Sequence, residues 1–376
     1  MKWFPKILAM TIFPNTLLFL LLVSGNGWAQ QALPRTFSTT GNLGRGDTGT
    51  ADTYGMDALF YNPAGLGSSG ELIEDIVVAS PQLTVSEELS DFSRNPSKYT
   101  QLKLSAEEAL EKYNRKNLNV DAQNFTGAVL DKLSYGFVNK AYADVTTDLN
   151  LLDLDHSLFN AETVAINGVI IGGSREIYDH LRLGVNVKAL NKLDAYTKVT
   201  PHALIEQIAI RKDVEIKELL VTTRGNGVGY DVGMLWEIPG RFTDATVGVA
   251  VFDAGDTTFK GTEARPRPEL QKVNIGTAVK TQIEGQTFTG TFDVNDVFYN
   301  DQTSIFNHIH MGLRCSYQTY VSVEVGLNQG YGTAGLLLHL KFLVLEYAKF
   351  TEELGKNPGD IPDIRDSIQA RIGWTL

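Results

Sequence analysis

The stretch "IRDSIQARIGWTL", residues 364–376, decides the fold, because its side chains alternate in character up to the last residue. The even-numbered positions are mostly apolar: Ile364, Asp366, Ile368, Ala370, Ile372, Trp374 and Leu376. The odd-numbered positions are small or polar: Arg365, Ser367, Gln369, Arg371, Gly373 and Thr375. Successive side chains of a β-strand point to opposite faces, so this pattern predicts a strand with one apolar face. A terminal strand of this kind is expected to pair with an early strand and remove a sheet edge.

The same alternation recurs through the second half of the chain. Residues 227–238 place Val228, Tyr230, Val232, Met234, Trp236 and Ile238 on one face, and mostly glycine, Asp231 and Glu237 on the other. Similar runs cover residues 273–280, 308–315 and 320–328, and short turn signals such as Pro239-Gly240 and Glu284-Gly285 separate the strands. With no helical pattern between these runs, the sequence predicts an antiparallel meander.

Two features favour a membrane barrel over a soluble β-sandwich, which stays the alternative. The second face keeps small and charged residues in one phase, as a watery lumen requires. Aromatic residues fall near the ends of runs, where interfacial girdles lie: Trp236, Tyr320, Tyr331, Tyr347 and Trp374. The predicted fold class is therefore all-β, an antiparallel transmembrane β-barrel of about 12–14 strands with an N-terminal plug segment and a helical insertion.

The order of segments predicts three parts. Residues 1–29 combine Lys2 and Lys6, a mostly apolar run and Gly27-Trp28-Ala29, which is typical of a cleaved signal peptide; an uncleaved anchor is the alternative. Residues 30–70 are expected to form a plug or hatch, and residues 71–376 the barrel. Two segments interrupt the meander, near 89–133, where Ser105 and Glu108 form a capping-box pattern, and near 201–219. Both are predicted to be helical insertions outside the membrane.

Composition narrows the classes of function. The net charge of −11 makes nucleic acid an unfavourable partner, because binding to phosphate rests on lysine and arginine. The single cysteine, Cys315, excludes an intramolecular disulfide and a four-cysteine zinc site.

Enzyme signatures are weak throughout. Gly44 to Gly49 match G-x-G-x-x-G but follow no strand, so a glycine-rich hinge explains them better than a dinucleotide site. His308 and His310 share one face of a predicted strand and read as lumen-facing polar residues rather than metal ligands. We expect no enzyme activity, no cofactor and no metal.

The stretch "DALFYNPAGLG", residues 57–67, carries a resemblance to a known family. Preceded by "GRGDTGTADTYGMDALFY", its Asn62-Pro63-Ala64 is similar to the motif in the N-terminal hatch of the long-chain fatty-acid transporter family of outer-membrane barrels. Residues 326–355 look more like a second group that also has an "NPAGL" near its start: type IX secretion barrels (PorV-like) and conjugal-transfer TraF-like proteins. The C-terminal Ile372, Trp374 and Leu376 resemble the assembly signal of bacterial outer-membrane barrels, although the aromatic residue precedes the last position by two.

The resemblance implies an outer-membrane protein of a Gram-negative bacterium, in which a plug fills the barrel. Its partners would be outer-membrane lipid, the barrel-assembly machinery and hydrophobic small molecules such as fatty acids, taken up passively through a hatch gap or a lateral opening. The alternative is a scaffold or shuttle that contacts secretion-system proteins. The plug and ligand path would comprise Phe60, Tyr61, Asn62, Pro63, Ala64, Gly65 and Leu66, unless this segment only seals the barrel. Pro63 biases Asn62 toward an extended backbone, and the Asn62 amide can bond the wall or its own backbone.

Overall fold

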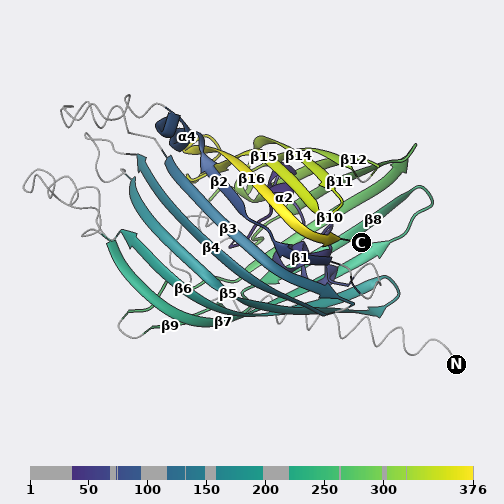
Figure 1. Ribbon diagram of the computed structural model, residues 1–376, viewed down its shortest axis with the longest axis horizontal. Coiled ribbons are helices and arrows are strands. Elements are labelled where there is room, and N and C mark those ends of the chain that lie inside the picture. Colours follow the sequence, from purple (N-terminus) through teal and green to yellow (C-terminus); the bar gives the residue numbers. More distant parts are fainter. Residues whose placement is uncertain are drawn as a thin grey trace, which may run out of the picture.

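The computed structural model shows a closed antiparallel barrel of 14 strands (Figure 1). It describes residues 36–67, 73, 75–94, 117–131, 133–148, 158–197, 220–261, 264–298, 303–318 and 320–375. The wall is formed by β1 (Asp75–Ala79) with β2 (Gln82–Ser86), then β3 (Asn117–Leu130), β4 (Leu133–Asp148), β5 (Leu158–Tyr178), β6 (Leu181–Thr197), β7 (Leu220–Ile238), β8 (Thr243–Phe252), β10 (Lys272–Ile283), β11 (Gln286–Val294), β12 (Ile309–Tyr317), β13 (Val321–Asn328), β14 (Tyr331–Leu340), β15 (Leu343–Glu353) and β16 (Pro362–Thr375). The two-residue β9 (Phe259–Lys260) pairs with β7 away from this path.

The first wall position is occupied by two short strands in place of one. Both β1 and β2 lie between β16 and β3, so the barrel closes against β16 as the C-terminal alternation predicted. A register shift at Val78 and the pair Ser80-Pro81 separate the two pieces. Proline has no backbone N–H to donate to a ladder, which accounts for the interruption. Together β1 and β2 therefore occupy one strand position of the wall.

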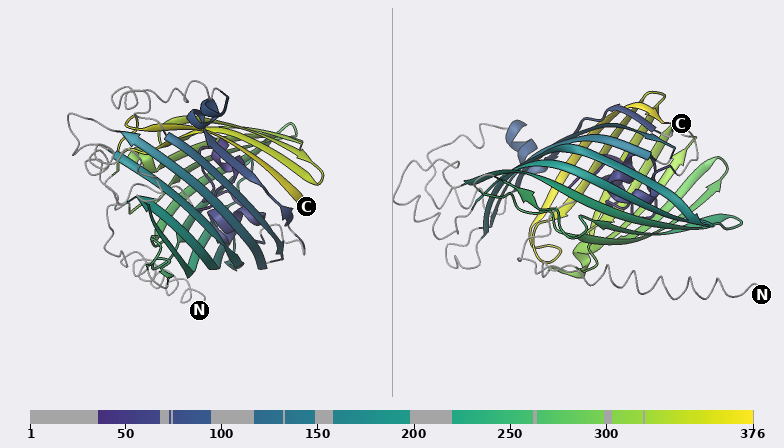
Figure 2. Two further views of the ribbon diagram at one scale, coloured as in Figure 1. Left: turned by 60° about the vertical axis from the view of Figure 1, so that its left-hand side comes forward. Right: turned by 90° about the horizontal axis from the view of Figure 1, so that it is seen from below.

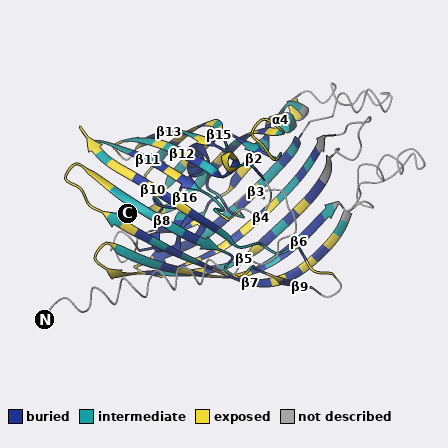
Figure 3. Ribbon diagram, turned by 180° about the vertical axis from the view of Figure 1, so that it is seen from behind, coloured by how far each residue is buried: buried dark blue, intermediate teal, exposed yellow. Residues whose placement is uncertain are grey.

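The outer face of the barrel is apolar over a continuous belt. Outward side chains such as Phe137, Val185, Val325 and Ile368 are each at least half exposed, and buried and exposed residues alternate along the strands (Figure 3). Aromatic residues gather at the end that carries the short turns: Tyr135, Tyr178, Trp236, Phe242, Tyr317, Tyr320, Phe342 and Trp374. An apolar belt with an aromatic girdle is the surface of an outer-membrane barrel, whose short turns face the periplasm.

A row of asparagines crosses the outer face of the wall from β3 to β7. Asn124, Asn139, Asn167, Asn191 and Asn226 are direct cross-strand partners from β3 to β7. The Nδ2 of Asn191 donates to Oδ1 of Asn226 at 2.7 Å, and Asn124 Oδ1 accepts from the backbone N–H of Ser80 at 2.9 Å. Phe137, Val169 and Val228 lie on the short-turn side of the row, next to it. The row thus forms a band of amide side chains on an outer face whose neighbouring residues, such as Phe137, Ala141 and Leu193, are apolar.

The plug lies inside the barrel, in the half nearer the short turns. Its elements are α2 (Thr40–Gly44), η1 (Gly55–Asp57), α3 (Ala58–Tyr61) and η2 (Pro63–Gly65). The two views of Figure 2 both show this purple segment enclosed by the strands. No helix in the described parts of the chain is long and apolar enough to cross a bilayer.

One predicted helical insertion is wrong over residues 117–130, and its residues 95–116 lie outside the described residues. Within residues 89–133 the helix α4 (Glu87–Arg94) ends at Arg94, and residues 117–130 form strand β3. The helical reading failed because the inward residues of β3, including Asn117, Asn119 and Asp121, are polar, and this concealed the alternation with Leu118 and Val120. The expected signal peptide 1–29, the ends of the plug at 30–35 and 68–70, the insertion 201–219 and Leu376 lie outside the described residues.

Candidate functional site

The Asn62-Pro63-Ala64 motif joins the plug to the barrel wall. Asn62 is fully buried, and its Nδ2 donates to the carbonyls of Thr50 at 2.7 Å, Met234 at 3.1 Å and Val249 at 3.4 Å. Its Oδ1 accepts from the backbone N–H of Ala64 at 3.1 Å and thereby caps η2. Asn62 has φ −163° and ψ 109°, an extended backbone like that expected before proline. The amide therefore bonds both the wall and its own backbone.

Glycines of the wall provide the space for this motif. A Cβ added at Gly184 on β6 would lie 2.2 Å from the carbonyl carbon of Pro63, and one at Gly233 on β7 would lie 2.0 Å from Asn62 Oδ1. Gly335 on β14 similarly contacts Gly44, with 3.0 Å from its Cβ position to the Gly44 Cα. Other inward glycines in close contact with plug atoms are Gly127, Gly136, Gly172, Gly248, Gly276, Gly312 and Gly326. The small face that the sequence assigned to the lumen is a seat for the plug.

Polar wall residues bind the plug around most of its circumference. Asp293 on β11 accepts from the backbone N–H groups of Gly49 at 2.8 Å and Thr50 at 2.9 Å. The other wall-to-plug hydrogen bonds come from β1, β3, β5, β6, β11, β12, β14, β15 and β16, through Asp75, Gln123, Ser174, Asn186, Thr291, His310, Thr333, Glu346, Ser367, Gln369 and Arg371. His310, considered above as a metal ligand, uses Nδ1 to contact the carbonyl of Gly46 at 2.9 Å.

The glycine-rich segment 44–49 is part of the plug core, and the hinge interpretation was wrong. Its Arg45 is fully buried and pairs with Asp52. Arg45 Nη2 also donates to Asn42 Oδ1 at 3.0 Å and to the Asp52 carbonyl at 3.2 Å. Burial raises the pKa of the Asp52 carboxyl, but the charges of Arg45 and Arg314 outweigh burial and hold that pKa below its usual value. A buried, charged pair of this kind fixes the loop rather than leaving it free to bend.

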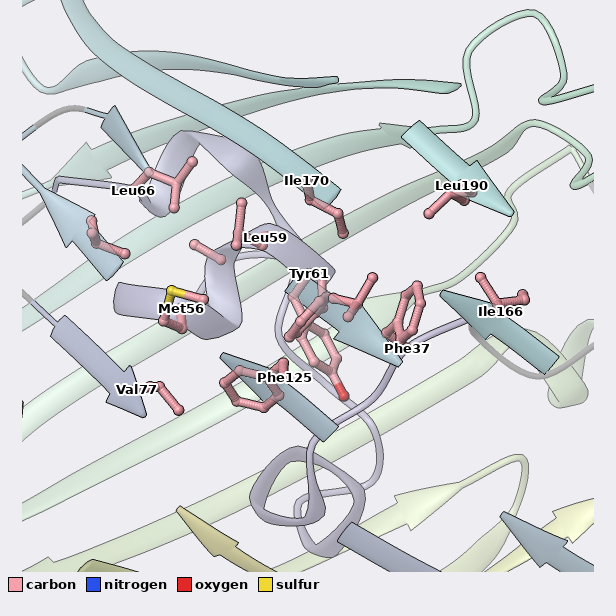
Figure 4. Close-up of a cluster of buried hydrophobic side chains, with 14 of the residues drawn as sticks. Phe37, Met56, Leu59, Tyr61, Leu66, Val77, Phe125, Ile166, Ile170 and Leu190 are labelled. Carbon is pink, nitrogen blue, oxygen red and sulfur yellow. The ribbon is translucent and has the colours of Figure 1, made fainter. Parts of the chain in front are cut away.

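An aromatic cluster fills the lumen where the plug meets the wall of β3 to β6 (Figure 4). The Phe60 ring lies between Phe37, at 5.6 Å between centroids, and Phe125, at 5.3 Å. Aliphatic side chains from the inner face of the wall complete the cluster: Val129, Val138, Val164, Ile166, Ile170 and Leu190. Apolar residues normally face the lipid in a barrel, so an inward apolar cluster in a polar lumen is a candidate contact surface for an apolar solute.

The connection between β8 and β10 folds into the lumen and closes over this cluster. Its Phe259 is buried within the cluster and lies on Gly227 of β7, whose Cβ position is 2.9 Å from the Phe259 ring. Glu269 binds Lys192 of β6 at 2.7 Å and accepts from Thr36, next to the plug, at 3.2 Å. Burial raises the pKa of the Glu269 carboxyl, but the charge of Lys192 outweighs it and lowers that pKa below its usual value. We call residues 253–261 and 264–271 the lumen loop.

The seven residues predicted for the plug and ligand path occupy two different environments. Asn62, Pro63 and Ala64 contact the wall of β6 to β8, whereas Gly65 packs against Thr53 and Ala58 of the plug itself. Phe60, Tyr61 and Leu66 belong to the buried cluster. No sequence motif marks Phe37, Phe125 or Phe259, because each is a lone aromatic residue that only the closed barrel brings to Phe60. Ile372 and Trp374 are exposed on the outer face of β16, where Trp374 packs on Phe342 at 5.0 Å between ring centroids.

Comparison with known proteins identifies the fold. No family model and no curated protein matches the chain. Among solved structures, the Ralstonia pickettii toluene transporter TbuX aligns with a TM-score of 0.51 at 12% identity, over 91% of this chain and 99% of that one. The monoaromatic hydrocarbon channel CymD gives 0.48 at 10% identity over 92% and 99%, and the Pseudomonas putida toluene transporter TodX gives 0.45 at 12% over 88% and 96%. The barrel architecture expected from the sequence is thus confirmed, and the chain shares the fold of TbuX.

Proposed function

We propose that this protein mediates passive uptake of hydrophobic small molecules across the outer membrane. The observation that carries the proposal is the Phe37, Phe60 and Phe125 cluster, which places an apolar surface inside the lumen, between plug and wall. TbuX, which has the same fold, is a toluene transporter, and this supports an apolar solute here. Within this class of solutes we propose fatty acids specifically, as the sequence resemblance suggested.

A solute would move from the outer mouth to this cluster and then leave through the wall. Below the cluster the plug is bonded to the wall on most strands, so straight passage would require the plug to move. The interruption between β1 and β2 offers a second exit on the side of β3, because Val78 and Ser80 bond there to the side chains of Thr126 and Asn124 and not to the β3 backbone. Val77 of β1 and Phe125 of β3 belong to the same buried cluster, which therefore reaches this interruption.

Uptake by whole cells tests the proposal. Cells that lack the protein should accumulate a radiolabelled aromatic hydrocarbon and a labelled fatty acid more slowly than cells that express it. Replacing Phe60 by Asn should lower uptake, because a polar amide then faces the solute, whereas the same change at Phe298, an exposed residue outside the strands, should not. Equal uptake with and without the protein, for every apolar solute tried, would exclude this function.

A scaffold in a secretion apparatus is the second candidate. The helix α4 lies against the outer side of the barrel, where its residues and the outward Tyr347, Lys349 and Asp366 line a recess of about 560 Å³. A polar recess outside the apolar belt could receive a segment of a partner protein. Affinity purification in detergent should then recover partner proteins with the wild-type chain and fewer with Lys349→Glu; a monomer without partners would rule the scaffold out.

A further inference from the structure

The inner face of β3 changes from polar to apolar along its length. From the outer end, its inward side chains are Asn117, Asn119, Asp121, Gln123, Phe125, Gly127 and Val129. Phe125 belongs to the aromatic cluster, and Gln123 is the next inward residue toward the outside. A molecule resting on Phe125 therefore has polar groups beside it on the side of the outer mouth.

Three successive inward residues of β3 each keep one acceptor oxygen without a hydrogen bond among the described residues. These oxygens are Asn119 Oδ1, Asp121 Oδ1 and Gln123 Oε1, and the side chains of Asn119 and Gln123 are more than nine-tenths buried. Their amide orientation is fixed, because Nδ2 of Asn119 donates to Asp144 at 3.0 Å and Nε2 of Gln123 donates to Gln82 at 2.7 Å. Buried acceptors without a donor are unfavourable, so a ligand that brings donors would relieve them.

The charged side chains of the lumen above the plug carry a negative excess, and Asp121 itself is paired through Oδ2 with Lys140 Nζ at 2.9 Å. Two further ion-paired clusters line the lumen above the plug: Lys188 with Asp231 at 2.7 Å and Asp253 at 2.8 Å, and Arg267 with Glu162 and Asp194 at 2.8 Å each. The carboxylates of this lumen network are Asp121, Asp144, Glu162, Asp194, Asp231, Asp253, Glu269 and Asp363, and its cations are Lys140, Lys188, Lys192, Arg267 and Arg365. Acids outnumber bases, and a lumen lined by an excess of one charge attracts the opposite charge.

We propose that the inward face of β3 from Asn119 to Gln123 is a binding site for an organic ammonium group, whose apolar body rests on Phe125 and Phe60. The site offers acceptors, and an ammonium has three donors and no acceptor. A carboxylate brings only acceptors and cannot satisfy these oxygens, and the positive charge of Lys140 is already taken up by Asp121, so this site disfavours it. The inference rests on the proposed uptake function and narrows its solutes from fatty-acid anions toward amphipathic amines.

Binding of three matched solutes tests the site. Isothermal titration calorimetry on the full barrel in detergent would compare 2-phenylethylammonium, 2-phenylethanol and phenylacetate, which share an aromatic body and differ in the polar end. The ammonium should bind tightest and phenylacetate weakest. Asp121→Asn should weaken binding of the ammonium by about tenfold, because a hydrogen bond to a neutral acceptor is weaker than one to a charged acceptor by about this factor. The affinity for 2-phenylethanol should change little. Asp121→Glu should keep the preference for the ammonium, and Asp244→Asn, at an exposed position near the short β7–β8 turn, should behave as wild type.

The outcomes separate this inference from the function on which it rests. Equal affinity for the three solutes, tighter binding of phenylacetate, or an ammonium preference unchanged by Asp121→Asn in a folded barrel would each overturn the ammonium site. Uptake of an uncharged aromatic hydrocarbon by whole cells would then still support the general function. Loss of that uptake signal would reject the function itself. A heat-modifiability gel on each variant confirms that the barrel is folded before it is scored.

Discussion

Replacing Gly184 by alanine should loosen the plug, because the new methyl group has no space. Its Cβ would lie 2.2 Å from the carbonyl carbon and oxygen of Pro63 and 2.4 Å from the Ala64 nitrogen, whereas ordinary contact begins at 3.4 Å. The atoms in the way are backbone, so no side-chain rotation relieves the clash, and the plug must retreat by about 1 Å. Overpacking of this kind costs about 1–3 kcal/mol. The equilibrium between seated and displaced plug should therefore shift by about 5- to 150-fold.

Amide hydrogen exchange measures this shift in the equilibrium between seated and displaced plug. The N–H of Gly65 bonds the Asn62 carbonyl at 3.0 Å, and the N–H of Leu66 bonds the Pro63 carbonyl at 3.2 Å. Both should exchange faster in Gly184→Ala, while amides in the middle of β13 keep their protection. The matched control is Gly290→Ala on β11, where an added Cβ meets nothing within 4 Å. If Gly184→Ala and Gly290→Ala exchange alike at these plug amides, the glycine seat does not hold the plug.

Four further changes test other parts of the structure. Asn62→Ala leaves the carbonyls of Thr50, Met234 and Val249 without their shared donor and should destabilise the plug by about 1–3 kcal/mol, measured by urea-dependent proteolysis; unchanged protection would refute the role of the amide. The Arg45–Asp52 pair should stabilise the plug fully above pH 3.8 and lose its effect as pH falls through the lowered pKa of Asp52, so exchange of plug amides should stay slow at pH 5 and accelerate only in stronger acid. Gly227→Ala places a Cβ 2.8 Å from the Thr258 carbonyl and should expel the lumen loop, making a cysteine introduced at Thr258 more reactive to a water-soluble maleimide. Trp374→Ala should lower the fraction of heat-modifiable, folded barrel in membranes, whereas Trp236→Ala, equally exposed in the girdle, should lower it less if the C-terminal strand acts as an assembly signal.

The sequence was most informative where structure depends on neighbours along the chain. Alternation in residues 227–238 and 364–375 predicted β7 and β16, because the period of two is a local property. The sequence was less informative at β1 and β2, where Pro81 is the residue that signals an interrupted strand. The strand β3 was missed for the physical reason that its polar residues face inward, beside a segment rich in helix formers.

The candidate site was predicted only in part, because its contacts join distant positions. Residues 57–67 identified the plug, but nothing near them shows that Asn62 meets β7 and β8, more than 170 residues away. In the sequence Gly184 and Gly233 look like ordinary small lumen residues. Only the structure shows that they contact Pro63 and Asn62 of the plug. Phe37, Phe125 and Phe259 likewise acquire a role only when the barrel closes and brings them to the cluster.

The spread of plug contacts has a consequence for how the barrel unfolds. In an empty barrel each strand touches only its two neighbours. The stability of such a barrel is then a sum of interactions between adjacent strands, as in a repeat protein, and segments can separate one at a time. Here Asp293 of β11, Asn186 of β6 and Glu346 of β15 all bind the same short segment, although these strands do not pair with one another. The plug couples opposite walls and turns a ring of local interactions into a single cooperative unit.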